Sequence, residues 1–134
     1  MNLTRSVSYA VGIMLQIESS RREGPLTAAR IAKGCKFPPR FLYRVLRRLV
    51  DAKLLVGTSG PGGGYALARP PRRITLLDIV LAVESAPEVS LLTPVRPKHR
   101  KAVAAINRLS QRHARRFTAD LRRTNLAGLS RLLK

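Results

Sequence analysis

The stretch "TSGPGGGYALARPP", residues 58–71, decides how this chain folds. Four glycines and one proline occupy positions 60–64, between the short apolar runs "LLVGT" (54–58) and "YALA" (65–68). Two apolar runs joined by a glycine-rich turn predict a β-hairpin. Glycines also line phosphate-binding loops, so the neighbouring sequence has to distinguish a nucleotide-binding loop from a hairpin tip.

A nucleotide-binding loop is not predicted, because the residues that such a loop needs are missing. A Walker loop ends in lysine followed by serine or threonine, and residues 54–97 contain no lysine. A dinucleotide-binding loop is followed by a helix, whereas "YALA" predicts a strand. No paired carboxylates or nucleophile constellation can be recognised either, so we expect that the protein is not an enzyme.

Apolar residues at helical spacing predict three helices before the hairpin and two after it. The predicted ranges are 4–19, 27–34, 39–52, 76–84 and 98–123, with 124–134 as a short terminal helix or an ordered tail. We expect Thr4, Thr27 and Thr75 to cap helices, and Gly34 to end the second helix in a left-handed conformation. Pro38 or Pro39 suits the first position of the third helix.

The third predicted helix is amphipathic and basic, and it stands directly before the hairpin. Two helices joined by a short turn, followed by a hairpin, are typical of a winged helix-turn-helix. We therefore predict a mainly α fold with a small β-hairpin wing and a long C-terminal helix. The apolar face of the third predicted helix comprises Phe41, Leu42, Val45, Leu46 and Leu49. The other side of that helix comprises Arg40, Tyr43, Arg44, Arg47 and Arg48.

The charge balance points to a polyanionic partner. The chain carries 26 Lys and Arg against 7 Asp and Glu, a formal charge of +19. Nucleic acid is the first candidate and an anionic membrane surface the second, while an arginine-rich composition that serves solubility is the alternative. A basic helix beside a glycine tip favours a wing that approaches a phosphate backbone, where glycine N–H groups contact phosphates. The alternative is a flexible hairpin tip.

A few residues indicate the cellular compartment of the protein and whether it can bind a metal. No apolar stretch is long enough to cross a bilayer, and Arg5, Gln16 and Glu18 interrupt the N-terminal apolar positions, so we expect a cytoplasmic protein without a signal peptide. The single cysteine, Cys35, excludes an intrachain disulfide and a multi-cysteine metal site. His99 and His113 lie outside the usual zinc spacing, so we expect no metal and no cofactor.

"GPLTAARIAKG" (24–34) and "FLYRVLRRLVDAKLLVGTSGPGGGYALARPPRRITLLDIVLAVE" (41–84) resemble the Rrf2 family of bacterial transcriptional regulators. The resemblance is strong over residues 1–84, most specific over 60–84, and holds only in outline beyond. It implies a DNA-binding domain (1–84), a loop (85–97) and a dimerisation helix with a C-terminal segment (98–134). It also implies a third helix in the major groove of double-stranded DNA and a wing in the adjacent minor groove.

The resemblance also assigns residues. Arg40 is the best candidate for a bidentate guanine contact. Tyr43 contacts a base or a phosphate, or packs against the wing, and Tyr9 contacts a phosphate or belongs to the core. The expected DNA-binding set is Thr4, Arg5, Thr27, Pro38, Arg40, Tyr43, Arg44, Arg47, Arg48, Ser59, Gly60, Gly62 and Gly63. The expected dimer interface, near coiled-coil spacing, is Val103, Ile106, Leu109, His113, Phe117 and Leu121.

The chain departs from the family pattern at three places. Prolines 38 and 39 stand where small hydroxyl residues are common, and Ser59 replaces a common arginine, so we expect a different target sequence. Cluster-binding members carry three cysteines before the long helix, whereas residues 85–101 have none, so we expect no iron–sulfur cluster. Cys35, flanked by Lys33 and Lys36, is either a redox switch or an inert turn or core residue.

The sequence thus predicts a homodimeric, sequence-specific repressor that binds a pseudo-palindromic operator. A sequence-tolerant architectural DNA-binding protein and a regulator acting mainly through a protein partner are the alternatives. The long helix carries nine basic residues and one acid, Asp120, which form either a second phosphate-binding surface or a solvated face.

Overall fold

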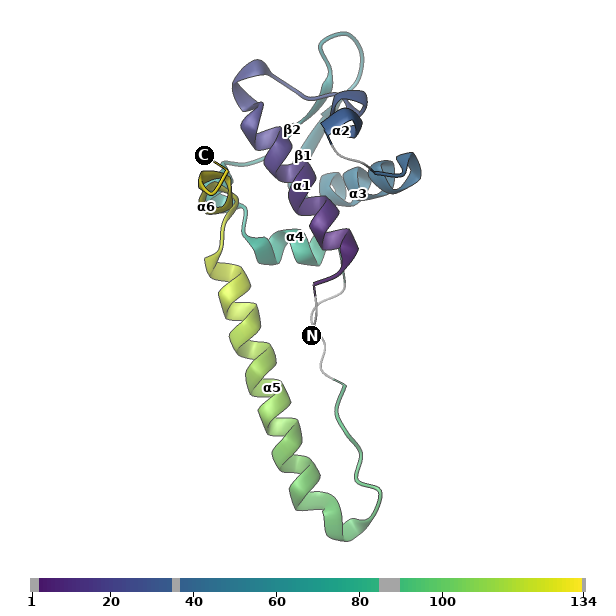
Figure 1. The fold of residues 1–134 in the computed structure, drawn as a ribbon, viewed down its shortest axis with the longest axis vertical. Helices are drawn as coiled ribbons and strands as arrows, with labels where there is room; N and C mark the ends of the chain where they lie inside the picture. The colour runs from purple at the N-terminus through teal and green to yellow at the C-terminus, as the bar shows by residue number, and fades with distance from the viewer. Residues whose placement is uncertain (1–2, 35–36, 85–89, 134) are drawn as a thin grey trace.

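A helical body with one β-hairpin and one projecting helix makes up the molecule (Figure 1). The computed structural model describes residues 3–34, 37–84 and 90–133. Its elements are α1 (Arg5–Ser19), η1 (Arg21–Glu23), α2 (Ala28–Gly34), α3 (Pro39–Asp51), β1 (Leu55–Thr58), β2 (Gly64–Leu67), η2 (Pro71–Arg73), α4 (Leu76–Val83), η3 (Pro97–His99), α5 (Arg100–Arg123) and α6 (Leu126–Arg131). The fold is the predicted one, mainly α with a small hairpin and a long C-terminal helix.

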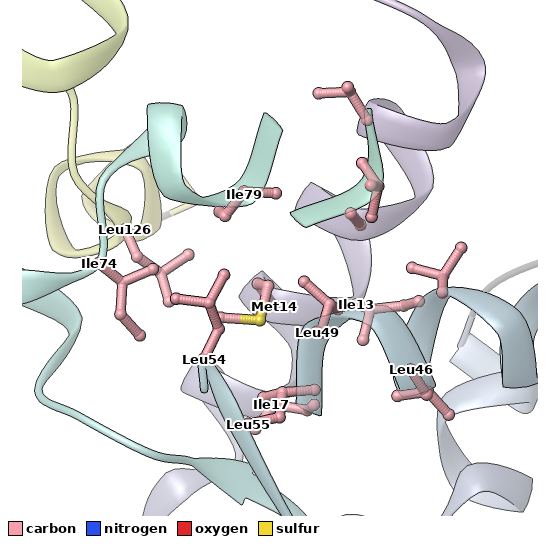
Figure 2. Close-up of a cluster of buried hydrophobic side chains, with 14 of the residues drawn as sticks. Ile13, Met14, Ile17, Leu46, Leu49, Leu54, Leu55, Ile74, Ile79 and Leu126 are labelled. Atoms are coloured by element: carbon pink, nitrogen blue, oxygen red, sulfur yellow. The ribbon is translucent and has the colours of Figure 1, made fainter. Parts of the chain in front are cut away.

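The core of the body is built around α1, which packs against α2, α3, α4, α6 and β2. Its buried side chains Ile13, Met14 and Ile17 meet residues from both halves of the chain (Figure 2). The partners labelled in that view are Leu46, Leu49, Leu54, Leu55, Ile74, Ile79 and Leu126. A single apolar cluster therefore fixes the orientation of α3 and of the hairpin relative to α1.

The hairpin follows the predicted pattern. Strands β1 and β2 pair antiparallel, with Leu55 opposite Leu67 and Thr58 opposite Gly64. At the tip, the Gly63 N–H donates to the Gly60 carbonyl at 3.0 Å, and Gly62 has a φ of 74°. A type II turn requires a positive φ at its third position, here Gly62, and it favours proline at its second position, here Pro61.

Two of the glycines are needed because the hairpin approaches its own chain closely. The Tyr65 N–H donates to the Leu26 carbonyl at 2.8 Å, and the Leu26 N–H donates to the Tyr65 carbonyl at 2.9 Å. A Cβ on Gly64 would stand 2.7 Å from the Leu26 carbonyl oxygen, and one on Gly63 would overlap the Thr58 carbonyl. These glycines therefore admit protein backbone rather than an external surface.

The helix ends confirm some predicted caps and correct others. The Thr27 hydroxyl accepts from the Arg30 N–H at 3.3 Å, and Thr75 forms a full capping box with Asp78. Thr4 precedes α1 but makes no side-chain cap; its hydroxyl donates to the Glu84 carboxylate. Gly34 is the last residue of α2 and lacks the expected positive φ. A Cβ at Gly34 would instead overlap the Gln16 side chain.

Three further boundaries are settled by the structure. Pro39 takes the first position of α3, with Pro38 as the residue before it. The helix α5 begins at Arg100 rather than at residue 98, because a 3₁₀ turn, η3, precedes it. Residues 90–96 form no helix or strand, in agreement with the predicted loop, and residues 85–89 lie outside the described ranges.

The C-terminal segment returns to the body. The Leu76 N–H donates to the Thr124 carbonyl at 2.7 Å, and the Leu126 N–H donates to the Ile74 carbonyl at 2.8 Å. The Ser130 hydroxyl also donates to the carboxylate of Glu18. As a result α6 and the end of α5 are anchored on α1, η2 and α4, while the remainder of α5 projects away from the body (Figure 1).

None of the helices in the described part of the chain combines the length and the apolar character needed to cross a membrane.

Candidate nucleic-acid interface

The outward face of α3 is basic and exposed. Leu42, Val45, Leu46 and Leu49 are buried, which fixes the rotation of the helix about its axis. The opposite face presents Arg40, Tyr43, Arg44 and Arg47, all exposed, with Tyr43 at 59%. The sequence predicted this division of the helix, and the structure brings these four side chains to one surface.

An aromatic cluster supports the start of this helix. The ring of Tyr9 packs edge-on against Phe37 at 4.5 Å between centroids and against Phe41 at 6.1 Å. The Arg44 guanidinium carbon lies 5.6 Å from the Phe41 ring centroid. The sequence placed Phe41 on the apolar face of the helix, but the structure shows that it is 41% exposed. Phe41 instead positions Arg44 through a cation–π contact.

A groove of about 500 Å³ separates α3 from the hairpin. Tyr43 and Arg47 line it from α3, and Gly57, Thr58 and Ser59 line it from β1 and the turn. Ser59, predicted as a DNA contact, is thus beside the exposed face of α3. The groove and the face together form a continuous surface, which we call the α3–wing surface.

The wing tip itself has two kinds of glycine. Gly60, Pro61 and Gly62 are exposed, whereas Gly63 is buried by the turn. Gly63 is therefore removed from the predicted set of DNA contacts, because its N–H already donates to the Gly60 carbonyl.

Arg48 serves the fold. Its Nη1 donates to the Val83 carbonyl at 2.8 Å and so ties α3 to the last turn of α4. Arg48 is nevertheless exposed and its guanidinium has further N–H donors, so the phosphate contact stays a prediction. Helix C-termini leave such carbonyls without intrahelical partners, and an arginine is a suitable donor.

The other predicted contacts are exposed, and two of them also serve the fold. Pro38 is exposed and precedes α3, and Arg5 is exposed on the first turn of α1. Thr27 is exposed, but its hydroxyl caps α2, while the Thr4 hydroxyl is engaged by Glu84. Cys35 lies outside the described residues, so its redox role stays a prediction.

A second surface, apolar in character, runs along α5. Ile106 is 47% exposed, Leu109 60% exposed, and His113 is exposed beside them. Val103 and Phe117 are half-buried, and Phe117 packs against the core. Leu121, predicted in the same stripe, is buried in the core of its own chain and is not free to contact a partner.

The loop before α5 carries further exposed apolar residues beside this helix, a feature that sequence analysis missed. Leu91, Leu92 and Val95 are exposed, and both backbone groups of Leu92 are bonded to the Asn107 side-chain amide at 2.9 and 3.0 Å. Asn107 therefore holds the loop against α5. The apolar run at 91–92 was visible in the sequence, but only its hydrogen bonds to Asn107 show that this loop lies against α5.

The exposed basic helix, the adjoining hairpin wing and the projecting C-terminal helix define a winged helix-turn-helix protein. Residues 3–131 match the model of the Rrf2 family, described as an iron-dependent transcriptional regulator. The chain belongs to the Rrf2 family of transcriptional regulators.

Curated relatives agree with this assignment. The putative HTH-type transcriptional regulator BadM of Rhodopseudomonas palustris is 36% identical over 84 residues, which cover 63% of this chain and 53% of BadM. The HTH-type transcriptional regulator IscR of Xenorhabdus nematophila is 34% identical over 86 residues, covering 64% of this chain and 52% of that protein. The aligned residues span about half the length of these relatives.

Solved structures show the same fold. The global cysteine regulator CymR of B. subtilis superimposes with a TM-score of 0.74 at 24% identity, covering 98% of both chains. IscR of T. potens gives a TM-score of 0.71 at 22% identity and covers 100% of this chain and 89% of that one.

The family description implies iron, and the donor set of this chain does not fit a thiolate-bound iron site. The sequence has one cysteine, and the described loop before α5 has none. Across residues 3–34, 37–84 and 90–133, no three His, Cys, Asp or Glu side chains lie close enough together to hold a metal ion. Iron–sulfur clusters need several thiolates, which one cysteine cannot supply.

Proposed function

We propose that this protein is a dimeric transcriptional repressor that binds a pseudo-palindromic DNA operator. The observation that carries the proposal is the α3–wing surface, where Arg40, Tyr43, Arg44 and Arg47 stand exposed beside a glycine-tipped hairpin. The formal charge of +19 supports a nucleic-acid partner. Membership of a family of transcriptional regulators supports the same conclusion.

The roles of the residues follow from their positions. Arg40, on the first turn of α3, is the proposed base contact, because a guanidinium binds O6 and N7 of guanine together. Arg44 and Arg47, farther along the same face, are proposed to bind phosphates, which position the protein without selecting a sequence. The exposed backbone at Gly60 and Gly62 is proposed to approach the adjacent groove.

The dimer is proposed to form through the apolar surface of α5. Ile106 and Leu109 are exposed in the single chain, and Leu91, Leu92 and Val95 lie exposed on the adjoining loop. Large apolar side chains gathered on one surface favour a partner that covers them. A second copy of the chain would supply the same stripe, and its two-fold axis would match a palindromic site.

Selection from a random duplex library at near-physiological salt, followed by sequencing, tests this function. We expect a two-fold symmetric motif whose half-sites are about one helical turn apart. Enrichment without any motif would contradict sequence-specific regulation and support an architectural DNA-binding protein instead. Because both kinds of protein bind more weakly as salt rises, the specificity ratio between selected and random duplexes is the deciding quantity.

A further inference from the structure

A second concave surface lies on the side of β2 that faces the end of α1. It is a pocket of about 530 Å³, within the range of small-molecule sites. Ile17 lines it from α1, Pro25 from the following loop, and Ala66 and Leu67 from β2. None of the proposed DNA contacts of α3 lines this pocket.

The chemistry of the lining selects a kind of ligand. Apart from Arg21 and Arg69, the residues that line the pocket are aliphatic, proline or glycine, and none of them is acidic. A wall of this composition can bind the apolar part of a ligand, and its two guanidinium groups can bind an anionic group of the same ligand.

Arg21 is the cation that a ligand can reach. It is exposed, and its side chain forms no hydrogen bond or ion pair that the described residues supply. Arg21 also lines a neighbouring polar cleft with Arg72 and Arg131. The acid in that cleft, Glu18, accepts a hydrogen bond from Ser130. Arg21 thus stands where an apolar pocket opens into a cationic cleft.

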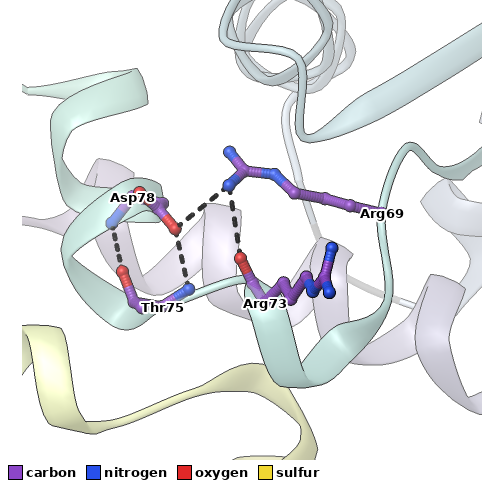
Figure 3. A network of polar contacts seen from close by, with 4 residues as sticks. All are labelled: Arg69, Arg73, Thr75 and Asp78. Carbon is purple, nitrogen blue, oxygen red and sulfur yellow. Dashed lines mark hydrogen bonds and ion pairs between the residues drawn. The ribbon is translucent and has the colours of Figure 1, made fainter.

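Arg69 is already engaged and connects the pocket to α4. Its Nη1 lies 3.7 Å from a carboxylate oxygen of Asp78 and donates to the Arg73 carbonyl at 3.2 Å (Figure 3). The same Asp78 oxygen accepts from the Thr75 N–H at 2.9 Å. An anion close to Arg69 would therefore compete with the carboxylate that caps α4.

We propose that this pocket binds a small organic anion with one apolar body and one carboxylate, of the size of a six- to eight-carbon monocarboxylate. The apolar body packs on Ile17, Pro25 and the β2 residues, and the carboxylate pairs with Arg21. Burial of each methylene adds about 0.8 kcal/mol, so affinity rises with chain length while the charge stays constant.

Occupancy is coupled to the wing. Ala66 and Leu67 belong to the strand that follows the wing tip. The preceding residue, Tyr65, is hydrogen-bonded to Leu26 through both its N–H and its carbonyl. A ligand that displaces β2 therefore moves the tip relative to α3. This regulatory consequence rests on the proposed DNA-binding function, whereas binding of the carboxylate does not.

The binding test is a nuclear magnetic resonance titration of the full chain labelled with ¹⁵N, using acetate, hexanoate and octanoate at equal ionic strength, with hexan-1-ol as the uncharged probe. We expect saturable shifts at the amides of Gly24, Ala66, Leu67 and Ala68, with affinity rising from acetate to octanoate. Shifts spread over the basic surface with equal affinity for acetate would overturn the proposal.

Two matched variants locate the charge contact. Arg21→Gln is expected to weaken octanoate binding about tenfold, as for loss of a charged hydrogen bond. Arg22→Gln removes the same charge from the adjacent exposed residue, which does not line the pocket, and is expected to change affinity by less than about twofold. Equal losses in the two variants would show diffuse attraction to the basic surface and contradict the proposal.

A third variant tests the apolar wall. Ala68→Leu fills part of the pocket and is expected to weaken hexanoate and octanoate binding while the unfolding temperature stays close to that of the parent. Unchanged affinity for both carboxylates in a folded Ala68→Leu protein would place them elsewhere and overturn the assignment.

The coupling is tested with the duplex obtained from the selection experiment. Fluorescence anisotropy is expected to show a changed DNA affinity on addition of octanoate and no change with the Arg21→Gln variant. Saturable carboxylate binding with unchanged DNA affinity would overturn the coupling and leave the pocket assignment supported. If the protein binds no duplex at all, the proposed function fails, and the titration still decides the pocket.

Discussion

Lys53 shows how a single residue carries strain. It is the one non-glycine residue with a positive φ, 61°, in the described ranges, and it follows the end of α3. The next N–H, that of Leu54, donates back to the Leu49 carbonyl at 3.0 Å, which closes the helix end. A left-handed residue at this position is commonly glycine, because an L side chain raises the energy of that conformation.

Lys53→Gly is therefore expected to stabilise the protein. The left-handed conformation costs about 1–2 kcal/mol for an L residue, and the added freedom of glycine in the unfolded chain offsets about half of it. We expect a net gain of about 0.5–1 kcal/mol in the free energy of unfolding, measured by urea denaturation. Lys53→Ala is the control, since it removes the charge but keeps the Cβ. A gain as large in the alanine variant would assign the effect to charge.

Arg40→Ala tests the proposed base contact. We expect binding to the selected duplex to weaken about tenfold or more, because a bidentate contact to guanine is lost. Arg22→Ala is the charge-matched control on η1, away from the α3–wing surface. On a scrambled duplex the loss for Arg40→Ala should be much smaller than on the selected duplex, since only phosphate attraction acts there, and Arg22→Ala should lose little on either. If anisotropy titrations showed that Arg40→Ala loses the same affinity on the selected and the scrambled duplex, Arg40 would not be a base contact.

Side-chain roles on α3 could be predicted from sequence only as far as helical periodicity reaches. Periodicity placed Leu42, Val45, Leu46 and Leu49 correctly in the core. It failed for Phe41 at the border of the apolar face, where Tyr9 on another helix decides the packing. It gave no sign of the bond from Arg48 to the Val83 carbonyl, because that carbonyl lies 35 residues away in sequence.

At the scale of the elements, α4 depends on its capping box. The Asp78 N–H donates to the Thr75 hydroxyl at 3.0 Å, and the Thr75 N–H donates to the Asp78 carboxylate at 2.9 Å. Thr75→Ala should lower the free energy of unfolding by about 1 kcal/mol, measured by chemical denaturation, while Thr75→Ser should retain most of the stability. Equal loss in both variants would show that the methyl group, rather than the hydroxyl, matters.

The elements themselves were largely predictable, because caps, prolines and glycines mark their ends locally. The hairpin, α3 and α4 all lie within a residue or two of the expected ranges. The bridge between Leu26 and Tyr65 was not predicted, since a pairing across 39 residues leaves no local pattern. The 3₁₀ turn η3 was missed for a related reason: Pro97 suits the first position of either kind of helix.

At the scale of the whole molecule, we propose that assembly depends on the apolar surface of α5. Leu109 is the more exposed of the two large apolar side chains on this part of α5. Leu109→Glu places a charge there and is expected to convert the proposed dimer to a monomer. Analytical ultracentrifugation measures the change. Gln111→Glu adds the same charge on another face of the helix and should leave the dimer intact. A monomeric parent protein, or an unaffected Leu109→Glu variant, would contradict assembly through α5.

The division of the chain into a DNA-binding part and a dimerisation part stays a prediction, and the course of the C-terminal segment was only partly visible in the sequence. The stripe from Val103 to Phe117 was found by its spacing, but the same spacing included Leu121, which belongs to the core. The backbone bonds at Thr124 and Leu126 draw the end of the chain onto α4. Such bonds depend on tertiary packing and carry no sequence signature.

The pairing of Leu26 with Tyr65 has a consequence for the rate at which different parts of the hairpin exchange amide hydrogens. Both N–H groups of this bridge are bonded, whereas the tip at Gly60 and Gly62 is exposed to solvent. Exchange at the base should therefore be slow and exchange at the tip fast. On the proposed contact with a groove, the compliant tip would lose conformational freedom while the rigid base would lose almost none, so the ordering cost would be confined to the few residues of the tip.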